Sequence, residues 1–337
     1  MNLAPHIAPA DAEGAAISDP FALVRDDLAL VELELESAAQ SPVRAITEIA
    51  DYLRQSGGKR IRPAVVLLTA RLAGCETGPR VRLAAVAEMI HAATLVHDDI
   101  IDAAETRRGR ASTNARWGNA KCVLAGDWLY MEAFAIALRE RHFEILEALI
   151  SLTQSMVEGE LMQLDMQGQV VSAGQHLELI ERKTARLFEV GAQLGALSAG
   201  APAASLEALA AFGRNLGLAF QMVDDILDFT ADAAVLGKPV GNDLREGKMT
   251  LPAIYAYAGA SAAERDQFEQ VMRDGDYAKV PLTAVQAVVA GSGALARAQA
   301  EARACARQAA DALAAFPPSP WRAALASLAE LVIARSY

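Results

Sequence analysis

Two aspartates embedded in an apolar helical stretch constrain this chain more than any other feature of its sequence. Residues 81–102 have the periodicity of a helix, and Asp98 and Asp102 lie four positions apart, so both carboxylates project from one face. His91, seven residues before Asp98, falls on the same stripe. The rest of the stretch is apolar nearly all round, and two carboxylates held close together in such surroundings repel each other strongly. We therefore expect this acidic stripe to bind a cation.

A second copy of the motif appears downstream. Asp224, Asp225 and Asp228 repeat the spacing Asp-Asp-x-x-Asp inside another apolar helical stretch, and Gln221 lies on the face of Asp224. One such motif is more often a solvated acidic surface, but two copies in apolar helices are far less easily explained that way. Carboxylates from two helices, with room for water, suit Mg²⁺, which commonly shares its site with phosphate groups. The sequence therefore predicts a magnesium site between two acidic helices.

Basic residues follow both motifs at positions that suit phosphate groups. Arg107 and Arg108 come shortly after the first motif, and guanidinium groups match the geometry of phosphate oxygens. Lys183 and Thr184 precede a helix rich in small residues, which permits close helix contact. The glycine-rich loop 237–248 follows the second motif and is interpreted as a flap that closes over phosphate. A surface Lys-Thr pair and a plain solvated loop are the alternatives for these two stretches.

A glycine turn at residues 57–63 carries three more cations, Lys59, Arg60 and Arg62, directly before an apolar helix. Two glycines let the backbone turn sharply, and a helix N-terminus attracts anions. The turn is therefore a candidate anion-binding site, although a solvated turn between helices explains it equally well. Metal-binding carboxylates and phosphate-binding cations together predict that the ligand is a diphosphate.

The composition favours a single all-α domain. Aromatic residues make up only 5% of the chain, and few segments alternate in the manner of strands. Asp127 and Glu160, inside two of the expected helices, are interpreted as capping or structural acids. We expect a disordered N-terminal arm over 1–20, a folded domain over 21–337, and helices over 21–40, 43–56, 64–72, 81–102, 119–139, 143–163 and 205–229.

Charge and cysteine usage restrict the partners and the compartment. A net charge of −11 argues against a nucleic-acid partner, which requires a basic face. The longest uncharged stretches are broken by Gly, Pro and Ser, so no membrane span is predicted. Three cysteines without disulfide or metal spacing fit a reducing cytosol, and the N-terminus has no features of a targeting segment. We therefore expect a cytoplasmic protein.

With these motifs the sequence resembles the trans-isoprenyl diphosphate synthases, and among them the long-chain, octaprenyl-type polyprenyl synthetases. The resemblance runs from about Val43 to the C-terminus. It implies a single-domain isoprenoid-synthase helical bundle around a deep central cavity, usually in a homodimer. It also implies a trans-prenyltransferase that condenses isopentenyl diphosphate with an allylic diphosphate to a long-chain all-trans lipid, for which a quinone side chain is the expected use.

The resemblance further assigns roles by position. Isopentenyl diphosphate is expected at Lys59, Arg62, His91 and Arg108, and the allylic diphosphate at Arg107, Lys183, Thr184, Gln221, Lys238 and Lys248. Mg²⁺, as three ions bound with the substrate diphosphate, is expected at Asp98, Asp102 and Asp224, with Asp228 acting through water. The catalytic set implied in this way is Asp98, Asp102, Arg107, Lys183, Asp224 and Lys238.

Two features favour a long product. The first motif has two residues between its acid pair and its last aspartate, where bacterial short-chain relatives commonly have four, and Ala93 and Thr94 just upstream are small. Thr94 lies one turn from Asp98 on the same face, whereas the role of Ala93 rests on resemblance alone.

Three alternatives remain: a farnesyl or geranylgeranyl diphosphate synthase, a terpene cyclase, and a non-catalytic subunit of a heteromeric prenyl synthase. A cyclase binds one diphosphate, so the cations at the glycine turn count against it. The two intact motifs count against a non-catalytic subunit.

Overall fold

Long helices make up nearly the whole of the computed structural model, which describes residues 19–76, 78–107, 109–231 and 240–334. In the first half they are η1 (Ala22–Val24), α1 (Arg25–Ala38), α2 (Arg44–Gln55), α3 (Ile61–Leu72), α4 (Pro79–Ile101), α5 (Thr113–Trp117), α6 (Asn119–Arg139) and α7 (Phe143–Met166). In the second half they are α8 (Ala173–Ile180), η2 (Glu181–Ala185), α9 (Arg186–Ser198), α10 (Ala203–Thr230), α12 (Asn242–Arg245), α13 (Leu251–Gly259), α14 (Ala262–Asp274), α15 (Leu282–Gly291), α16 (Ala294–Ala312), η3 (Leu313–Ala315) and α17 (Pro320–Ile333). The predicted all-α fold is confirmed.

A short antiparallel hairpin, which the helical prediction does not include, follows α4. Its strands are β1 (Thr106–Arg107) and β2 (Arg110–Ala111), paired Thr106 with Ala111 and Arg107 with Arg110. The Tyr52 hydroxyl of α2 donates a 2.7 Å hydrogen bond to the Ala111 carbonyl and ties the hairpin to the helical body. The hairpin therefore holds Arg107 in a fixed place beside the end of the first acidic helix.

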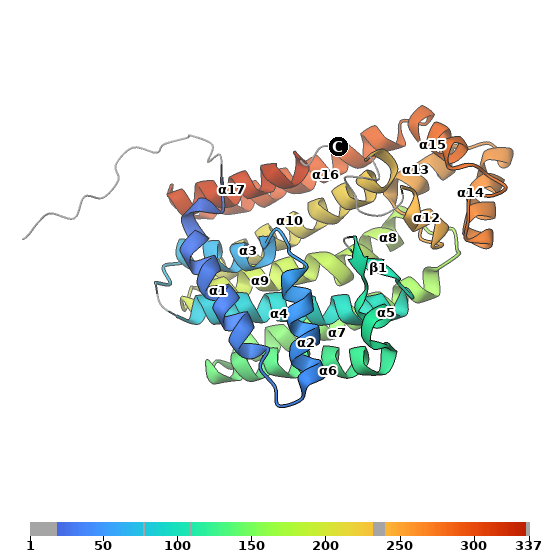
Figure 1. Ribbon diagram of the computed structural model, residues 1–337. Coiled ribbons are helices and arrows are strands. Elements are labelled where there is room, and N and C mark those ends of the chain that lie inside the picture. Colours follow the sequence, from blue (N-terminus) through green and yellow to red (C-terminus); the bar gives the residue numbers. More distant parts are fainter. Residues whose placement is uncertain (1–18, 77, 108, 232–239, 335–337) are drawn as a thin grey trace, which may run out of the picture.

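The two acidic helices lie in the middle of the molecule. Figure 1 shows α4, α9 and α10 between α6 and α7 on one side and α16 and α17 on the other. α4 packs on α6, α9 packs between α3 and α10, and α10 packs on α16. Helices α12 to α15 gather at one end with a small apolar core of their own. Both acidic motifs therefore lie on helices that are packed on several sides.

Glycines allow two of these helix pairs to approach closely, as the small residues of α9 predict. A Cβ atom built on Gly195 of α9 would lie 2.1 Å from the Thr69 hydroxyl of α3. A Cβ atom built on Gly217 of α10 would lie 2.5 Å from the Ala185 Cα of η2. Because no side chain fits at either position, the backbones can pack directly against one another.

The start of the folded body is slightly earlier than predicted. The Phe21 amide donates a 3.0 Å hydrogen bond to the Asp19 carboxylate, and Pro20 is buried, so these two positions of the predicted arm belong to the body. The rest of that arm, residues 1–18, lies outside the described residues.

Among the residues that the structure describes, no helix combines the length and the apolar character needed to cross a bilayer.

Candidate active site

Both acidic helices line one large cavity of about 590 Å³. Its walls come from α3, α4, α6, α7, η2, α9 and α10 and from the hairpin. Asp98 and Asp102 of the first motif and Asp224 of the second all line it. The polar lining consists of Arg62, His91, Thr94, His97, Asp98, Asp102, Arg107, Tyr130, Glu160, Lys183, Thr184, Gln221 and Asp224. The apolar lining consists of Leu95, Ile101, Met156, Val157, Leu161, Leu164, Leu187 and Phe220. Carboxylates, cations and a long apolar wall thus share one space.

The first acidic motif divides its aspartates between the cavity and the protein interior. Asp98 and Asp102 line the cavity, as predicted from their spacing. Asp99 is fully buried and accepts hydrogen bonds from Arg107 Nε at 2.5 Å and from the Thr113 amide and hydroxyl at 3.1 and 3.0 Å. Asp99 thereby holds the Arg107 side chain. Sequence reasoning missed this role, although its position one residue after Asp98 places it on a different face of the helix.

The surroundings of the Asp98 carboxyl group disfavour its negatively charged form. Burial raises its pKa to about 6, and the charges of Glu160 and Asp102 act in the same direction. Lys183 and Arg107 oppose this rise without cancelling it. The protein alone therefore leaves this carboxylate short of positive charge.

The second acidic motif shows the same division. Asp224 is exposed and lines the cavity, while Asp225 and Asp228 are buried. Asp228 is fully buried, and its carboxylate accepts a 3.2 Å hydrogen bond from the Asp243 amide at the start of α12. Its carbonyl accepts another, at 2.7 Å, from the Gly241 amide. The structure thus places Asp228 at the anchor of the following loop, outside the cavity lining where the predicted metal site lies.

Lys183 enters the cavity from η2, a short π-helical segment between α8 and α9. Such segments are rare and frequent at functional sites, and this one was not predicted. The Lys183 ammonium group lies 2.5 Å from the Glu160 carboxylate and donates a 3.1 Å hydrogen bond to Gln163. Glu160, interpreted from the sequence as a capping or structural acid, is therefore a cavity residue that pairs with a predicted ligand-binding lysine.

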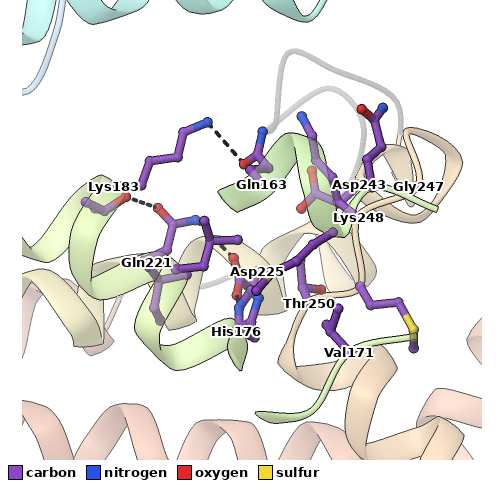
Figure 2. Close-up of a pocket in the computed structure, with 16 residues that line it drawn as sticks. Gln163, Val171, His176, Lys183, Gln221, Asp225, Asp243, Gly247, Lys248 and Thr250 are labelled. Carbon is purple, nitrogen blue, oxygen red and sulfur yellow. Dashed lines mark hydrogen bonds and ion pairs between the residues drawn. The ribbon is translucent and has the colours of Figure 1, made fainter. Parts of the chain in front are cut away.

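Thr184 and Gln221 lie side by side, as their shared predicted role requires. The Thr184 hydroxyl donates a 2.9 Å hydrogen bond to Gln221 Oε1. Gln221 Nε2 donates at 3.0 Å to Asp225, whose other oxygen lies 2.7 Å from His176 Nε2. Figure 2 shows Gln221, Asp225 and His176 of this row. They line a second pocket of about 190 Å³, which shares Lys183, Thr184 and Gln221 with the main cavity. His176 was not predicted, because it is distant in sequence from both motifs.

Lys248, which comes after the second acidic helix in the chain, contacts an aspartate of the first motif. Its ammonium group donates hydrogen bonds to Asp102 at 3.0 Å and to Glu246 at 2.8 Å. Burial lowers the pKa of Lys248, but the attraction of these two carboxylates outweighs burial, so its pKa lies above the ordinary value. Lys238, the other lysine predicted in this loop, lies outside the described residues.

The residues predicted for isopentenyl diphosphate fall into two groups. Arg62 and His91 line the cavity, and the Arg62 guanidinium lies 4.9 Å from the centre of the Phe188 ring. Lys59 is exposed at the glycine turn and is not part of the cavity lining. Arg108 lies outside the described residues.

The glycine turn itself is held by Arg60. This residue has a left-handed backbone conformation with φ of 49° and forms ion pairs of 2.5 Å with Glu32 of α1 and Glu88 of α4. Arg60 therefore fixes the turn rather than facing a ligand, and Arg62 at the start of α3 is the cation that reaches the cavity.

The two residues predicted to affect product length lie in different places. Thr94 lines the cavity, and its hydroxyl donates a 2.8 Å hydrogen bond to the His91 carbonyl. Ala93 is fully buried in the main core and does not line the cavity. Only Thr94 can therefore contact a bound hydrocarbon directly.

The donor set of the cavity fits a hard divalent cation. Asp98, Asp102 and Asp224 contribute carboxylate oxygens from two helices, the ligand type that Mg²⁺ and Ca²⁺ prefer. Within the described ranges, no three His, Cys, Asp or Glu side chains are close enough to form a complete metal cluster. A cation in this cavity would therefore need further oxygen ligands, such as those of water or phosphate.

Comparisons with known proteins find close matches to this chain in both sequence and structure. The model of the polyprenyl synthetase family matches residues 43–289. Octaprenyl diphosphate synthase from Haemophilus influenzae is 38% identical over 316 residues, covering 94% of this chain and 96% of that protein. The all-trans-nonaprenyl-diphosphate synthase (geranyl-diphosphate specific) of Rhodobacter capsulatus is 38% identical over 320 residues, covering 94% and 97%. Among solved structures, the polyprenyl synthase of Caulobacter crescentus, complexed with calcium and isoprenyl diphosphate, superposes with a TM-score of 0.90 at 38% identity, covering 94% of this chain and 97% of that one.

Proposed function

Because this chain belongs to the polyprenyl synthetase family, we propose that it is a trans-prenyltransferase which condenses isopentenyl diphosphate with an allylic diphosphate to a long-chain all-trans polyprenyl diphosphate. One observation carries the proposal. Asp98 and Asp102 of the first motif and Asp224 of the second line a single cavity together with Arg107, Lys183 and an apolar wall. Such a cavity suits a substrate with an anionic head and a hydrocarbon tail.

Mg²⁺ is the metal proposed for this cavity, as three ions bound together with the substrate diphosphate. Asp98, Asp102 and Asp224 would hold it, because their oxygens face the same space and the surroundings of Asp98 lack positive charge. Mg²⁺, when bound, supplies positive charge that stabilises the diphosphate leaving group. Asp228 is left out of this ligand set because it is fully buried at the loop anchor.

The cations of the cavity stabilise the charge that develops as the allylic diphosphate leaves. Arg107 is held in place by Asp99 and Lys183 by Glu160 and Gln163, so both are oriented before the reaction begins. We place Thr184, Gln221 and Lys248 at the same diphosphate, with Lys238 as a further candidate.

Isopentenyl diphosphate is assigned to the part of the cavity lined by Arg62 and His91, with Lys59 and Arg108 as further candidates. Its double bond attacks the allylic cation that forms when the diphosphate departs. A proton is then lost to the released diphosphate, so no protein base is required. The apolar wall excludes water, which would otherwise quench the cation.

The growing hydrocarbon would extend along the apolar wall of the cavity. Thr94 is small and keeps the space beneath Asp98 open, which supports a long product. Ala93 lies in the core behind it, so its size can affect the cavity only through the packing of α4.

A homodimer is proposed from the exposed surface of α6 and α7. Large apolar side chains recur there every seven residues, which aligns them along one face of each helix. On α6 they are Leu124, Met131 and Leu138, and on α7 they are Phe143 and Ile150, with exposed fractions between 49% and 81%. Val157 and Leu164 continue the row on α7 where the helix borders the cavity. A second copy of this chain would cover this stripe.

The proposed activity is tested by mixing the pure protein with farnesyl diphosphate, isopentenyl diphosphate and Mg²⁺ and measuring product mass. We expect lipids longer than twenty carbons. A product that stops at fifteen or twenty carbons would indicate a short-chain synthase, release of a hydrocarbon without consumption of isopentenyl diphosphate would indicate a cyclase, and no product would indicate a non-catalytic subunit.

Asp98→Ala tests the metal-binding role in the same assay. Because the variant removes one proposed ligand, turnover should fall by roughly a hundredfold or more while the helical circular dichroism is retained. Asp266→Ala, at an exposed position of α14, is the matched control and should retain full activity. Equal activity of the two variants would contradict the metal assignment.

A further inference from the structure

A buried histidine outside the cavity is connected to it by an unbroken row of hydrogen bonds. His176 belongs to α8, whose start is fixed by a capping box between Ser172 and Gln175. The His176 side chain is 5% exposed, and the Asp225 side chain to which it is hydrogen-bonded is 2% exposed. In Figure 2, His176 and Asp225 lie next to each other, with Gln221 on the side of the row nearer Lys183.

The Asp225 carboxylate lies at the centre of the row and determines the direction of the neighbouring hydrogen bonds. A carboxylate only accepts hydrogen bonds, so Gln221 must turn its amide nitrogen towards Asp225. The amide oxygen of Gln221 then faces Thr184, whose hydroxyl must donate to it. The hydroxyl hydrogen of Thr184 is thus used inside the protein, and the oxygen faces the cavity as an acceptor only.

We propose that His176 is a positioning residue that acts through Asp225 and Gln221 to fix the orientation of the Thr184 hydroxyl in the cavity. His176 donates to one oxygen of Asp225 and thereby holds the carboxylate in the plane in which its other oxygen meets Gln221. Without that donor the carboxylate can rotate, and the oxygen that accepts from the Gln221 amide nitrogen is no longer held in place. This inference rests on the proposed function, because it assigns a role within that same site.

The cost of breaking these buried hydrogen bonds supports a role of His176 beyond packing. Buried polar groups that lose a partner are costly, so a row of four bonded side chains keeps one arrangement. η2 carries Thr184 directly after α8, and the Ala185 backbone packs against Gly217 of α10. The backbone at both ends of the row is therefore fixed. What His176 controls is the direction of the hydrogen bonds between the side chains of the row.

The experiment is a double-mutant cycle measured with the full-length protein in the prenyl transfer assay. His176→Phe keeps an aromatic ring at this position but removes the hydrogen-bond donor. It should lower kcat/KM for the allylic substrate by about tenfold to a hundredfold. KM for isopentenyl diphosphate should stay unchanged. His176→Gln, whose amide nitrogen reaches the position of Nε2, should recover activity to within about threefold of the wild type. In a Thr184→Ala background, His176→Phe should cause less than about a twofold further loss.

Tyr255→Phe is the matched control, since it removes a 2.7 Å hydrogen bond from a partly buried side chain to the Glu301 carboxylate outside the cavity. It should leave both kinetic constants unchanged. Equal losses from His176→Phe in the wild-type and Thr184→Ala backgrounds would overturn the proposal, and so would a His176→Gln variant as impaired as His176→Phe.

If His176→Phe does not fold, Asp225→Asn replaces it in the same cycle, because it removes the carboxylate through which His176 orients Gln221. Loss of allylic kcat/KM that disappears in the Thr184→Ala background supports the proposal, and an additive loss contradicts it. Failure of the proposed function is a separate result, because the wild-type protein itself would then make no prenyl product.

Discussion

Each acidic motif assigns its aspartates to two different tasks. The first aspartate of each motif, Asp98 or Asp224, lines the cavity, and the second, Asp99 or Asp225, is buried among hydrogen-bond donors from other elements. The adjacent residues differ by about 100° around the helix axis, so one faces ligand and the other faces the protein. The buried member orients a neighbouring side chain, Arg107 in one case and Gln221 in the other.

Replacing Asp98 by asparagine should stabilise the metal-free protein at neutral pH. The folded-state pKa of about 6 lies above the ordinary value of 3.8, so the folded state holds this proton more tightly than the unfolded state does. Stability is therefore lost as pH rises from about 4 to about 6, and the full penalty, at most about 3 kcal/mol, is present at pH 7. Asp98→Asn removes that penalty.

Denaturant unfolding in chelator at pH 4, 5, 6 and 7.5 measures this effect. The difference in unfolding free energy between Asp98→Asn and the wild type should grow with pH. Asp266→Asn, exposed on α14, should show no such growth. Parallel curves for Asp98→Asn and the wild type would contradict the assignment of the raised pKa to this carboxyl group.

At the scale of elements, sequence patterns predicted the helices well and the irregular segments poorly. Helical periodicity located α4 and α10 because their apolar and acidic faces repeat over many residues. The π-helical η2 and the β1–β2 hairpin have too few residues to show a period, and their shapes depend on tertiary contacts such as Arg107 with Asp99. The buried place of Asp228 likewise depends on the backbone amides of Gly241 and Asp243, which donate hydrogen bonds to it.

Gly217→Ala should disturb η2 without touching a cavity residue. The added Cβ would lie 2.5 Å from the Ala185 Cα, so η2 must move away from α10 and shift Lys183 and Thr184. We expect a loss of about 1–3 kcal/mol in unfolding free energy and a marked fall in kcat.

Gly191→Ala on α9 is the matched control for this substitution. Its Cβ would meet only Val66, at an ordinary distance of 3.5 Å, and alanine favours a helix by up to about 1 kcal/mol. Unfolding free energy should therefore rise slightly and kcat should stay unchanged. Similar behaviour of the two variants would mean that the close contact at Gly217 does not hold η2 in place.

At the scale of the whole molecule, helices that are distant in sequence must assemble before a site exists. The Lys248 ammonium group and the Asp102 carboxylate are 146 positions apart and lie 3.0 Å from each other. The two motifs predicted the acidic helices, and together with the other basic stretches and the family resemblance they predicted most of the polar cavity residues. They could not predict Glu160 or His176, whose places are determined by how α7 and α8 pack.

Met131→Glu should prevent self-association of the proposed dimer. The side chain is 62% exposed in the middle of the apolar stripe on α6, and two buried charges facing each other across an interface would strongly oppose association. Sedimentation equilibrium should give a dimer for the wild type and a monomer for the variant. Leu33→Glu, on α1 at 61% exposure, should remain dimeric. A monomeric wild type, or a dimeric Met131→Glu variant, would contradict the proposed interface.

The two described lysines of the site, Lys183 in the cavity and Lys248 beside it, already have carboxylate partners within the protein. Lys183 is paired with Glu160 and Lys248 with Asp102, so each ammonium group has a negative counter-charge before a ligand binds. Arrival of a diphosphate with its cations is then an exchange of partners, in which each lysine releases a protein carboxylate and takes a phosphate oxygen. Binding then depends on the difference in free energy between the ionic contacts that are broken and those that replace them. It therefore favours a ligand that brings both an anion for the lysines and a cation for the carboxylates that the lysines release.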